Sequence, residues 1–371
     1  MPDLRIQMPL DEHFSRASDD ELRSRISKAK EQLGKDLIIL GHHYQRDEVI
    51  DFADARGDSY KLARFAAENA DTPHIIFCGV HFMAESADVL VNENQHVYLP
   101  DLNAGCSMAD MASLKQVETA WKTFTKTVEE NDIVPITYMN SSAAIKAFVG
   151  EHGGAVCTSS NARKIIEWGL NKGKHILFIP DQHLGRNTAY EMGHSEKDCY
   201  LYDPRMSINT DMKVLKEKTF WLWKGHCSVH QRFTPEHVQE FKQENPDGIV
   251  VVHPETRHEV VELADYVGST EKIIDYVDTA EPGSSIGVAT EVHLVQRLAK
   301  ENPDKKVVSL DPLYCPCSTM FRIDLPHLAW CIESIVAGTP VNEISVDENT
   351  RHWSRISLQR MLDITETNTT D

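Results

Sequence analysis

The stretch "DLIILGHHYQ" (residues 36–45) contains the pattern on which the fold prediction depends. Its run of apolar residues is typical of a buried strand, and the strand runs directly into polar residues. A helical pattern follows in "SYKLARFAAENA" (59–70), and "HIIFCGV" (74–80) is a second apolar strand. Apolar runs that alternate with helical patterns indicate parallel α/β units.

The same order of strand, polar residues and helix occurs twice more. "DIVPITYMNSSAAIKAFVG" (132–150) and "GIVVVHPETRHEVVELADYV" (248–267) both begin with an apolar strand that ends in polar residues. Each copy continues to a further strand and then to a cysteine. The separation between the strand-end residue and that cysteine is 64 residues for His42 to Cys106, 64 for His253 to Cys317, and 89 for Tyr138 to Cys227. The 25 extra residues in the middle copy predict an insertion near residues 188–215.

A hydroxyl residue recurs at a similar place in each copy. Ser59 lies 17 residues after His42, Thr270 lies 17 after His253, and Ser159 lies 21 after Tyr138. A single Ser or Thr near the start of a helix is usually an N-cap. Three at matched positions favour a shared anion site, because helix N-termini and strand carboxyl ends gather ligands in α/β units. We therefore expect an α/β fold of three pseudo-symmetric domains with parallel sheets around a common centre.

The repeat also predicts the domain boundaries. We expect a helical extension over residues 1–35, a first α/β domain over 36–120, a second over 121–240 that contains the insertion, and a third over 241–324. Helices within residues 325–365 are expected to pack on the first domain.

Composition excludes several classes of partner. The chain has 371 residues, of which 41% are hydrophobic and 26% charged, and its 38 Lys and Arg against 57 Asp and Glu give a net charge of −19. A strongly acidic chain without a basic run is not expected to bind nucleic acid or an anionic membrane. No apolar segment approaches 18 residues and the first residues lack an apolar signal-peptide run, so we expect a cytoplasmic protein.

The eight cysteines fall into two groups. In a large cytosolic chain a disulfide framework is not expected, and most cysteines are small core residues. That role is assigned to Cys78, Cys331, Cys157 and Cys199. Cys106, Cys227 and one cysteine of "CPC" (315–317) close the three repeats, so they are expected to meet at one metal site. The 64-residue spacing favours Cys317 over Cys315, which would give 62.

Ten short motifs, taken together and in order, resemble the quinolinate synthase family. They are "GHHYQ", "FCGVHFMAESADVL", "AGCSMAD", "YMNSS", "CTSSNA", "PDQHLG", "GHCSVH", "VVHPE", "GSTEKI" and "CPCSTM". The resemblance implies a triangle of three α/β domains around a central active site with a [4Fe–4S] cluster, held by one cysteine per domain. It also implies the condensation of iminoaspartate with dihydroxyacetone phosphate to quinolinate, two waters and phosphate, in de novo NAD biosynthesis. L-aspartate oxidase would supply the iminoaspartate.

The resemblance carries residue roles over at matched positions. The cluster ligands would be Cys106, Cys227 and Cys317. The substrate-binding residues would be His42, Ser59, Tyr138, Met139, Asn140, Ser159, His253, Pro254, Glu255 and Thr270. The catalytic residues would be Glu255, His253, Tyr138, Tyr44 and His230. This chain has "CPCSTM" where many family members have a single cysteine in "CPNM".

The chemistry of these residue types agrees with a dehydrating condensation. Three thiolates on a four-iron cluster leave one iron open to act as a Lewis acid on a substrate oxygen. Glu255 and His253, two residues apart at a strand end, are candidates for general base and partner. Tyr138 and Tyr44 would orient or protonate carbonyl oxygens. The substrate anions would be held by Ser59, Ser159 and Thr270 together with helix N-terminal N–H groups.

Two other classes compete with this interpretation. An iron–sulfur sensor that binds a metabolite without turnover would be expected to carry a basic DNA-contacting helix, which the sequence lacks. A zinc hydrolase that uses Cys and His would prefer closely spaced ligands. A brown, oxygen-labile protein would exclude zinc, and quinolinate formation would separate an enzyme from a sensor.

Overall fold

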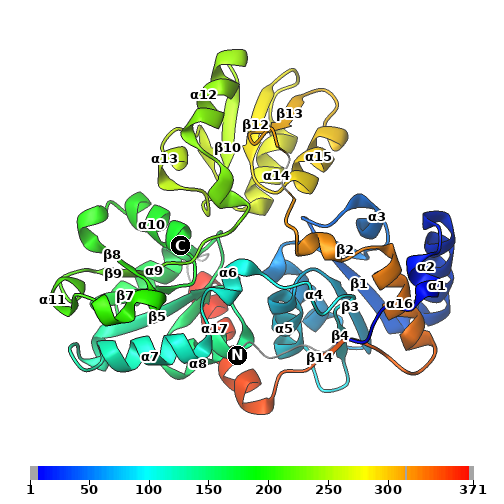
Figure 1. Ribbon diagram of the computed structural model, residues 1–371, viewed down its shortest axis with the longest axis horizontal. Coiled ribbons are helices and arrows are strands. Elements are labelled where there is room, and N and C mark those ends of the chain that lie inside the picture. The colour runs from blue at the N-terminus through cyan, green and yellow to red at the C-terminus, as the bar shows by residue number, and fades with distance from the viewer. Residues whose placement is uncertain (1–6, 314–315, 367–371) are drawn as a thin grey trace. The chain divides into compact units, whose positions relative to one another are not determined.

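The computed structural model describes residues 7–313 and 316–366 (Figure 1). Its described strands form three sheets, each mostly parallel and each accompanied by helices. Two compact units make up the chain. The first contains residues 7–106, 291–297 and 316–347, and the second contains residues 107–290, 298–313 and 348–366.

Each sheet is built from four parallel strands and, in two sheets, one added edge strand. The first sheet contains β1 (Leu37–His42), β2 (Ala55–Gly57), β3 (His74–Cys78), β4 (His96–Tyr98) and β14 (Glu343–Ile344). The second contains β5 (Ile133–Tyr138), β6 (Ala155–Cys157), β7 (His175–Ile179), β8 (Cys199–Tyr202) and β9 (Phe220–Trp223). The third contains β10 (Ile249–Val252), β11 (Tyr266–Val267), β12 (Ser285–Ala289) and β13 (Lys306–Ser309).

One strand order is repeated in all three sheets. It is β2-β1-β3-β4 in the first, β6-β5-β7-β9 in the second and β11-β10-β12-β13 in the third, with every neighbouring pair parallel. His42 and Tyr138 are the last residues of β1 and β5, and His253 follows β10 directly. The structure therefore confirms three pseudo-symmetric α/β repeats with parallel sheets.

The helices follow the same repeat. The first copy has α2 (Asp19–Leu33), α3 (Asp47–Ile50), α4 (Ser59–Glu68) and α5 (His81–Leu90). The second has α7 (Leu114–Phe124), α8 (Ala143–Glu151), α9 (Ala162–Leu170) and α10 (Gln182–Glu191). The third has α12 (Pro235–Glu244), α13 (His258–Val261), α14 (Thr270–Thr279) and α15 (Val292–Glu301). Short helices α1 (Glu12–Ser15) and α6 (Ser107–Asp110) lie outside this pattern.

The helix α2 is part of the first repeat rather than only an extension. It precedes β1 as α7 precedes β5 and α12 precedes β10. Its N-cap is Ser18, whose hydroxyl accepts a hydrogen bond from the Glu21 backbone N–H at 3.3 Å. Lys30 of α2 pairs with Asp54 at 2.7 Å, and Lys242 of α12 pairs with the equivalent Asp265 at 2.5 Å. The two repeats thus share helix, strand and ion pair.

The insertion in the second repeat adds a strand that the sequence did not reveal. Strand β8 pairs in parallel with β9, from Cys199 opposite Phe220 to Tyr202 opposite Trp223. The connection between them contains α11 (Met212–Leu215). Only Tyr202 of β8 is fully buried, as is usual in an edge strand, and the strand is a short segment, Cys-Tyr-Leu-Tyr, without the Val and Ile residues that mark the central strands. In the first sheet, β14 is the added edge strand and is antiparallel to β4.

The two C-terminal helices pack in different places, which corrects one expectation. Helix α16 (Leu325–Val336) lies beside α2, where Arg25 makes two 2.7 Å hydrogen bonds to the Glu333 carboxylate (Figure 1). Helix α17 (Glu348–Glu366) packs on α8 of the second repeat instead, and Ser354 donates to Ala143 O at 2.7 Å. The expectation that helices up to residue 365 pack on the first domain is therefore wrong for α17.

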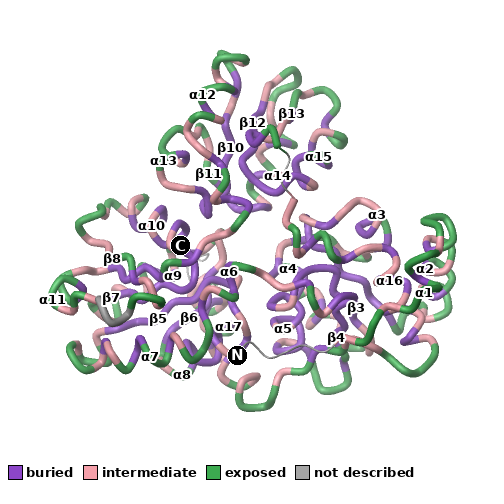
Figure 2. Tube along the Cα trace, viewed as in Figure 1, coloured by how far each residue is buried: buried purple, intermediate pink, exposed green. Residues whose placement is uncertain are grey.

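The central strands form the core of each sheet. Every residue of β1, β5 and β7 is buried, whereas the outward faces of α2 and α12 are exposed (Figure 2). Burial of continuous Ile, Leu and Val runs on both faces is what parallel sheets covered by helices require.

Within the described residues, no helix combines the length and the apolar character needed to cross a bilayer.

Candidate active site

The strand-end loops of the first and third repeats have the same local structure. Nδ1 of His42 accepts a hydrogen bond from Tyr44 N at 3.1 Å, and Nδ1 of His253 accepts one from Glu255 N at 3.3 Å. The second residue after each strand end is therefore held by the ring at the strand end. In the second repeat the corresponding residue is Asn140, two residues after Tyr138. The repeat thus places a phenol, an amide and a carboxylate at equivalent positions.

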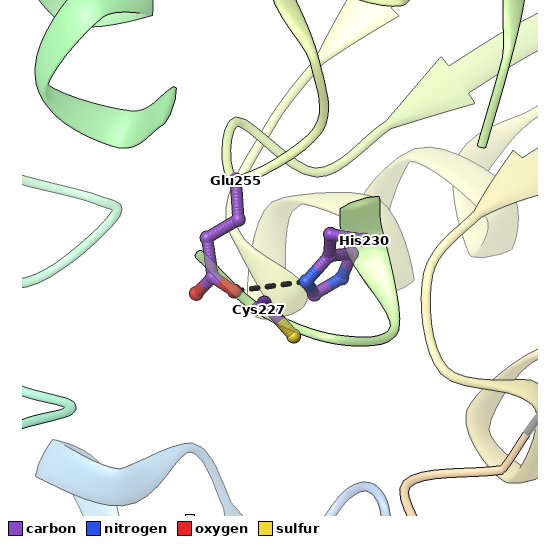
Figure 3. Close-up of side chains that lie close together, drawn as sticks. All are labelled: Cys227, His230 and Glu255. Carbon is purple, nitrogen blue, oxygen red and sulfur yellow. Dashed lines mark hydrogen bonds and ion pairs between the residues drawn. The ribbon is translucent and has the colours of Figure 1, made fainter. Parts of the chain in front are cut away.

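Glu255 is the centre of a buried network in the second unit. Its side chain is 3% exposed, and Oε1 accepts a 2.6 Å hydrogen bond from Tyr138 OH. Oε2 lies 2.8 Å from Nδ1 of His230, the contact drawn in Figure 3. The His253 ring stacks on the His230 ring with centroids 4.5 Å apart. Four of the predicted catalytic residues are thus brought together.

Electrostatics keep this carboxyl group ionised. Burial opposes the charged form of Glu255, but the His230 and His253 rings, with hydrogen bonds from His230 and Tyr138, outweigh burial and lower its pKa to about 2. Burial, the largest influence on His253, lowers the pKa of that ring to about 3. The arrangement therefore offers a carboxylate beside a neutral imidazole in a site from which water is largely excluded.

Two residues of this site were missed by the sequence analysis. Thr290 directly follows β12, and its Oγ1 lies 3.1 Å from Nε2 of His230. Asp181 follows β7 and is fully buried, and burial together with the charge of Glu255 raises its pKa well above its ordinary value. Both follow the end of the third strand of their repeat. A polar residue after an apolar strand is the same signal that identified His42, Tyr138 and His253, and it could have identified these two residues.

The three predicted anion-binding hydroxyls lie near helix starts but are not N-caps. Ser59 and Thr270 are the first residues of α4 and α14, and both side chains are mostly buried. Ser159 lies in the turn that precedes α9. The cap of α4 is Asp58, whose carboxylate accepts from Tyr60 N and Lys61 N. Ser59 and Thr270 therefore do not serve as the N-caps of their own helices, whose caps are Asp58 and Ser269.

The other predicted substrate residues occupy the same loops. Met139 is 2% exposed, Asn140 is half-buried and Pro254 is buried. In the first unit, His42 is 4% exposed and Tyr44 is half-buried. All of them stand within two residues of a strand carboxyl end.

The three predicted cluster ligands share one position in the repeat. Cys106, Cys227 and Cys317 each follow the fourth parallel strand, β4, β9 and β13 respectively, and each is half-buried and in no disulfide. The backbone N–H of Cys317 donates to Oε1 of the buried Glu291 at 3.2 Å, and its Sγ lies 3.4 Å from Thr319 Oγ1. Accessible thiols are the donors that iron–sulfur clusters require, so the donor set fits. Cys315 lies outside the described residues.

Three of the four cysteines assigned to the core are more deeply buried than the predicted ligands. Cys78, Cys157 and Cys331 are fully buried, which confirms their structural role. Burial raises the pKa of all three thiols, that of Cys78 to about 12. Cys199 is half-buried in β8, and burial raises its pKa to about 11.

Cys227, His230 and Glu255 also form a compact group of possible metal ligands. Their ligand atoms lie within 4.8 Å of one another (Figure 3). However, the His230 ring contacts Glu255 through one nitrogen and Thr290 through the other, and Glu255 Oε1 accepts from Tyr138. A metal at this point would have to break those hydrogen bonds, so the group is better described as an acid–base network beside one thiol.

Comparison with known proteins decides the family. A model of the quinolinate synthetase A protein family matches residues 24–363. The chain belongs to this family. It is 50% identical to the quinolinate synthase of Lysinibacillus sphaericus, over 95% of this chain and 96% of that protein. It is 52% identical to the quinolinate synthase of Streptomyces coelicolor, over 93% of this chain and 89% of that protein. The resemblance inferred from short motifs is therefore confirmed over most of this chain.

Proposed function

We propose that this protein is a quinolinate synthase of NAD biosynthesis that condenses iminoaspartate with dihydroxyacetone phosphate to quinolinate, two waters and phosphate. The observation that supports it most directly is the buried Tyr138–Glu255–His230 network, found in a member of the quinolinate synthetase A family. The reaction must form a carbon–carbon bond, close an imine and lose water, and each step moves protons. The network supplies groups that can move them.

Glu255 is the proposed general base. It is ionised, and hydrogen bonds from Tyr138 and His230 fix both of its oxygens. A carboxylate held in this way can take a proton from substrate carbon or nitrogen and return it to a departing oxygen. His253 is neutral and stacks on His230, and because its Nδ1 accepts a hydrogen bond from Glu255 N, its Nε2 carries the ring hydrogen and can donate a hydrogen bond to a substrate oxygen. Tyr138 and Tyr44 are proposed to orient substrate carbonyl oxygens.

The proposed cofactor is a [4Fe–4S] cluster held by Cys106, Cys227 and Cys317. A cluster with three protein thiolates would supply an open iron that polarises a substrate oxygen and eases the loss of water. The structure contributes the donor type and the equivalent placement of the three cysteines after the fourth strand of each repeat. The hydroxyls of Ser59, Ser159 and Thr270, with helix N–H groups, are proposed to bind the substrate carboxylates and phosphate.

The cellular setting forms part of the same proposal. We propose a cytoplasmic enzyme that receives iminoaspartate from L-aspartate oxidase and has no nucleic-acid or membrane partner. The net charge of −19 supports the last point, because a strongly acidic surface repels polyanions.

Anaerobic assay tests the proposed function. Protein purified without oxygen should contain iron and sulfide and should form quinolinate only when both substrates are present, as measured by mass spectrometry. A zinc-loaded protein would instead support a hydrolase built on Cys227, His230 and Glu255. An iron–sulfur protein that forms no quinolinate with either order of substrate addition would support the sensor interpretation.

A further inference from the structure

The strand-end loop of the first repeat is held by a buried arginine. Arg297 of α15 is 5% exposed, and its guanidinium donates to His43 O at 2.8 Å and to Gln45 O at 2.6 Å. It also pairs with Asp47 Oδ1 at 2.8 Å. These acceptors lie one, three and five residues after His42, in the loop that carries Tyr44.

The loop of the third repeat is held at the same three positions. Asn187 of α10 is 7% exposed, and its Nδ2 donates to Pro254 O and to Thr256 O, both at 2.8 Å. Its Oδ1 lies 3.0 Å from Nδ1 of His258. These partners lie one, three and five residues after His253, in the loop that carries Glu255. The hydrogen-bond pattern of Arg297 is therefore repeated by a different side chain.

The two donors occupy equivalent places in the fold. Arg297 lies eight residues after Ala289, the end of β12, and Asn187 lies eight residues after Ile179, the end of β7. Each comes from the helix that follows the third strand of one repeat and holds the strand-end loop of another repeat. The residue five positions after the strand end also suits the donor that it contacts. Arg297 pairs with the carboxylate of Asp47, and the Asn187 amide contacts the imidazole of His258.

In the loop of the second repeat, a third type of side chain bonds the equivalent carbonyls. Lys146 of α8 is fully buried, and its Nζ donates to Met139 O at 2.8 Å and to Ser141 O. These carbonyls again lie one and three residues after the strand end, Tyr138. A lysine from the adjacent helix thus does in this loop what Arg297 and Asn187 do in the others.

Holding these carbonyls fixes the residue between them. In the first and third loops, the ring at the strand end accepts a hydrogen bond from the backbone N–H of Tyr44 or Glu255. Arg297 in the first loop and Asn187 in the third, which we call the clamp residues, donate to the carbonyls on either side of that N–H. Buried carbonyls without a donor are costly, so loss of the clamp leaves the loop to find another conformation. We propose that Arg297 and Asn187 are positioning residues that hold Tyr44 and Glu255, respectively, in their working orientation. The catalytic meaning of this inference rests on the proposed function.

Hydrogen–deuterium exchange of the anaerobic holoenzyme tests the two clamps separately. Arg297→Ala should speed amide exchange in residues 43–47 by about tenfold or more, on the scale of losing buried hydrogen bonds, while residues 255–258 stay unchanged. Asn187→Asp, which keeps the shape but replaces the donor with an acceptor, should produce the reverse pattern. Gln296→Ala, at an exposed neighbour on α15, is the matched control and should change neither loop. Equal acceleration in both loops, or in neither, would overturn the inference.

Turnover measurements separate positioning from a general structural role. Both variants should keep wild-type iron content and lower kcat by about tenfold or more, the size expected when a reacting group is misplaced. Added guanidinium should restore part of the kcat of Arg297→Ala but none of that of Asn187→Asp. Arg297→Lys, a milder change that keeps the buried charge, should fall between wild type and Arg297→Ala. Unchanged kcat in a variant whose loop exchanges faster would contradict a positioning role.

If the wild type forms no quinolinate, the proposed function fails, whereas the exchange pattern still decides whether the clamps hold the loops.

Discussion

Tyr138 OH donates a 2.6 Å hydrogen bond to Oε1 of Glu255, joining the carboxyl ends of two strands, β5 and β10, that belong to different sheets. The two residues are 117 positions apart in the sequence. Because the acceptor is an ionised carboxylate, the hydrogen bond is charge-assisted and helps to keep Glu255 deprotonated. The bond therefore links the orientation of the phenol to the protonation state of the proposed base.

Replacing Tyr138 with Phe tests this bond. The variant should keep fold and iron content but lose one hydrogen bond to a charged group, worth about 1.5–3 kcal/mol, so kcat should fall about tenfold or more. Tyr200→Phe is the matched control, because Tyr200 lies in the edge strand β8, where its hydroxyl accepts a hydrogen bond from Asp211 N at 3.3 Å. Equal rates for the two variants would remove Tyr138 from the mechanism.

Replacing Glu255 with Gln tests the general base. The amide preserves the shape of the side chain but cannot take a proton, so turnover should fall by about 10²–10⁴-fold while the cluster and fold remain. Glu259→Gln, at an exposed position on α13, should leave turnover unchanged. Rates near wild type at saturating substrate in Glu255→Gln would show that another group is the base.

Metal analysis can separate the proposed cluster ligands from the other cysteines. Cys106→Ser, Cys227→Ser and Cys317→Ser should each lose iron and sulfide, because serine is a poor replacement for a cluster thiolate. Cys78→Ser should retain both, since Cys78 is a buried core residue. Cys315→Ser should also retain the cluster. An intact cluster in Cys317→Ser, or its loss only in Cys315→Ser, would reverse the assignment of the third ligand.

Thiol labelling provides a check that does not depend on activity. In cluster-free native protein at pH 8, an alkylating reagent should modify Cys106 and Cys227 but not Cys78, Cys157 or Cys331. Burial raises the pKa of Cys78 from 9.0 to about 12, so its reactive thiolate is scarce at this pH, and the reagent cannot reach it. Denaturant should make all the thiols reactive. Peptide mass spectrometry that finds Cys78 labelled in the folded protein would contradict the structure.

The contact between α17 and α8 predicts a stability effect without a catalytic one. A Cβ at Gly150 would lie 2.1 Å from the backbone oxygen of Trp353, so Gly150→Ala must push the two helices apart. Overpacking of this kind typically costs about 1–3 kcal/mol, and the melting temperature should fall accordingly. Glu151→Ala, at the exposed neighbouring position, should change it little. An unchanged melting temperature in Gly150→Ala would mean that α17 does not pack there.

The sequence alone determined the three repeats, their strand-end residues and the candidate ligands. Each of these is a local pattern: an apolar run marks a buried parallel strand, and polar residues directly after it mark the carboxyl edge of a sheet. The equal spacing of His42 to Cys106 and of His253 to Cys317 then showed that these two cysteines occupy equivalent positions in their repeats. The short motifs pointed to the family for the same reason, since each is a contiguous string of residues.

The tertiary structure decided which distant elements touch. The amphipathic pattern of α17 shows that one face is buried but not that its partner is α8. Edge strand β8 is a short Cys-Tyr-Leu-Tyr segment without the Val and Ile residues that mark a central strand. Likewise, nothing local in "VHLVQRLAKE" (292–301) shows that Arg297 reaches the carbonyls of His43 and Gln45, some 250 residues earlier. The hydrophobic effect is non-directional, so an apolar helix face can be buried against many different apolar surfaces. A hydrogen bond instead needs one acceptor at a particular distance and angle, and only the folded chain brings donor and acceptor together.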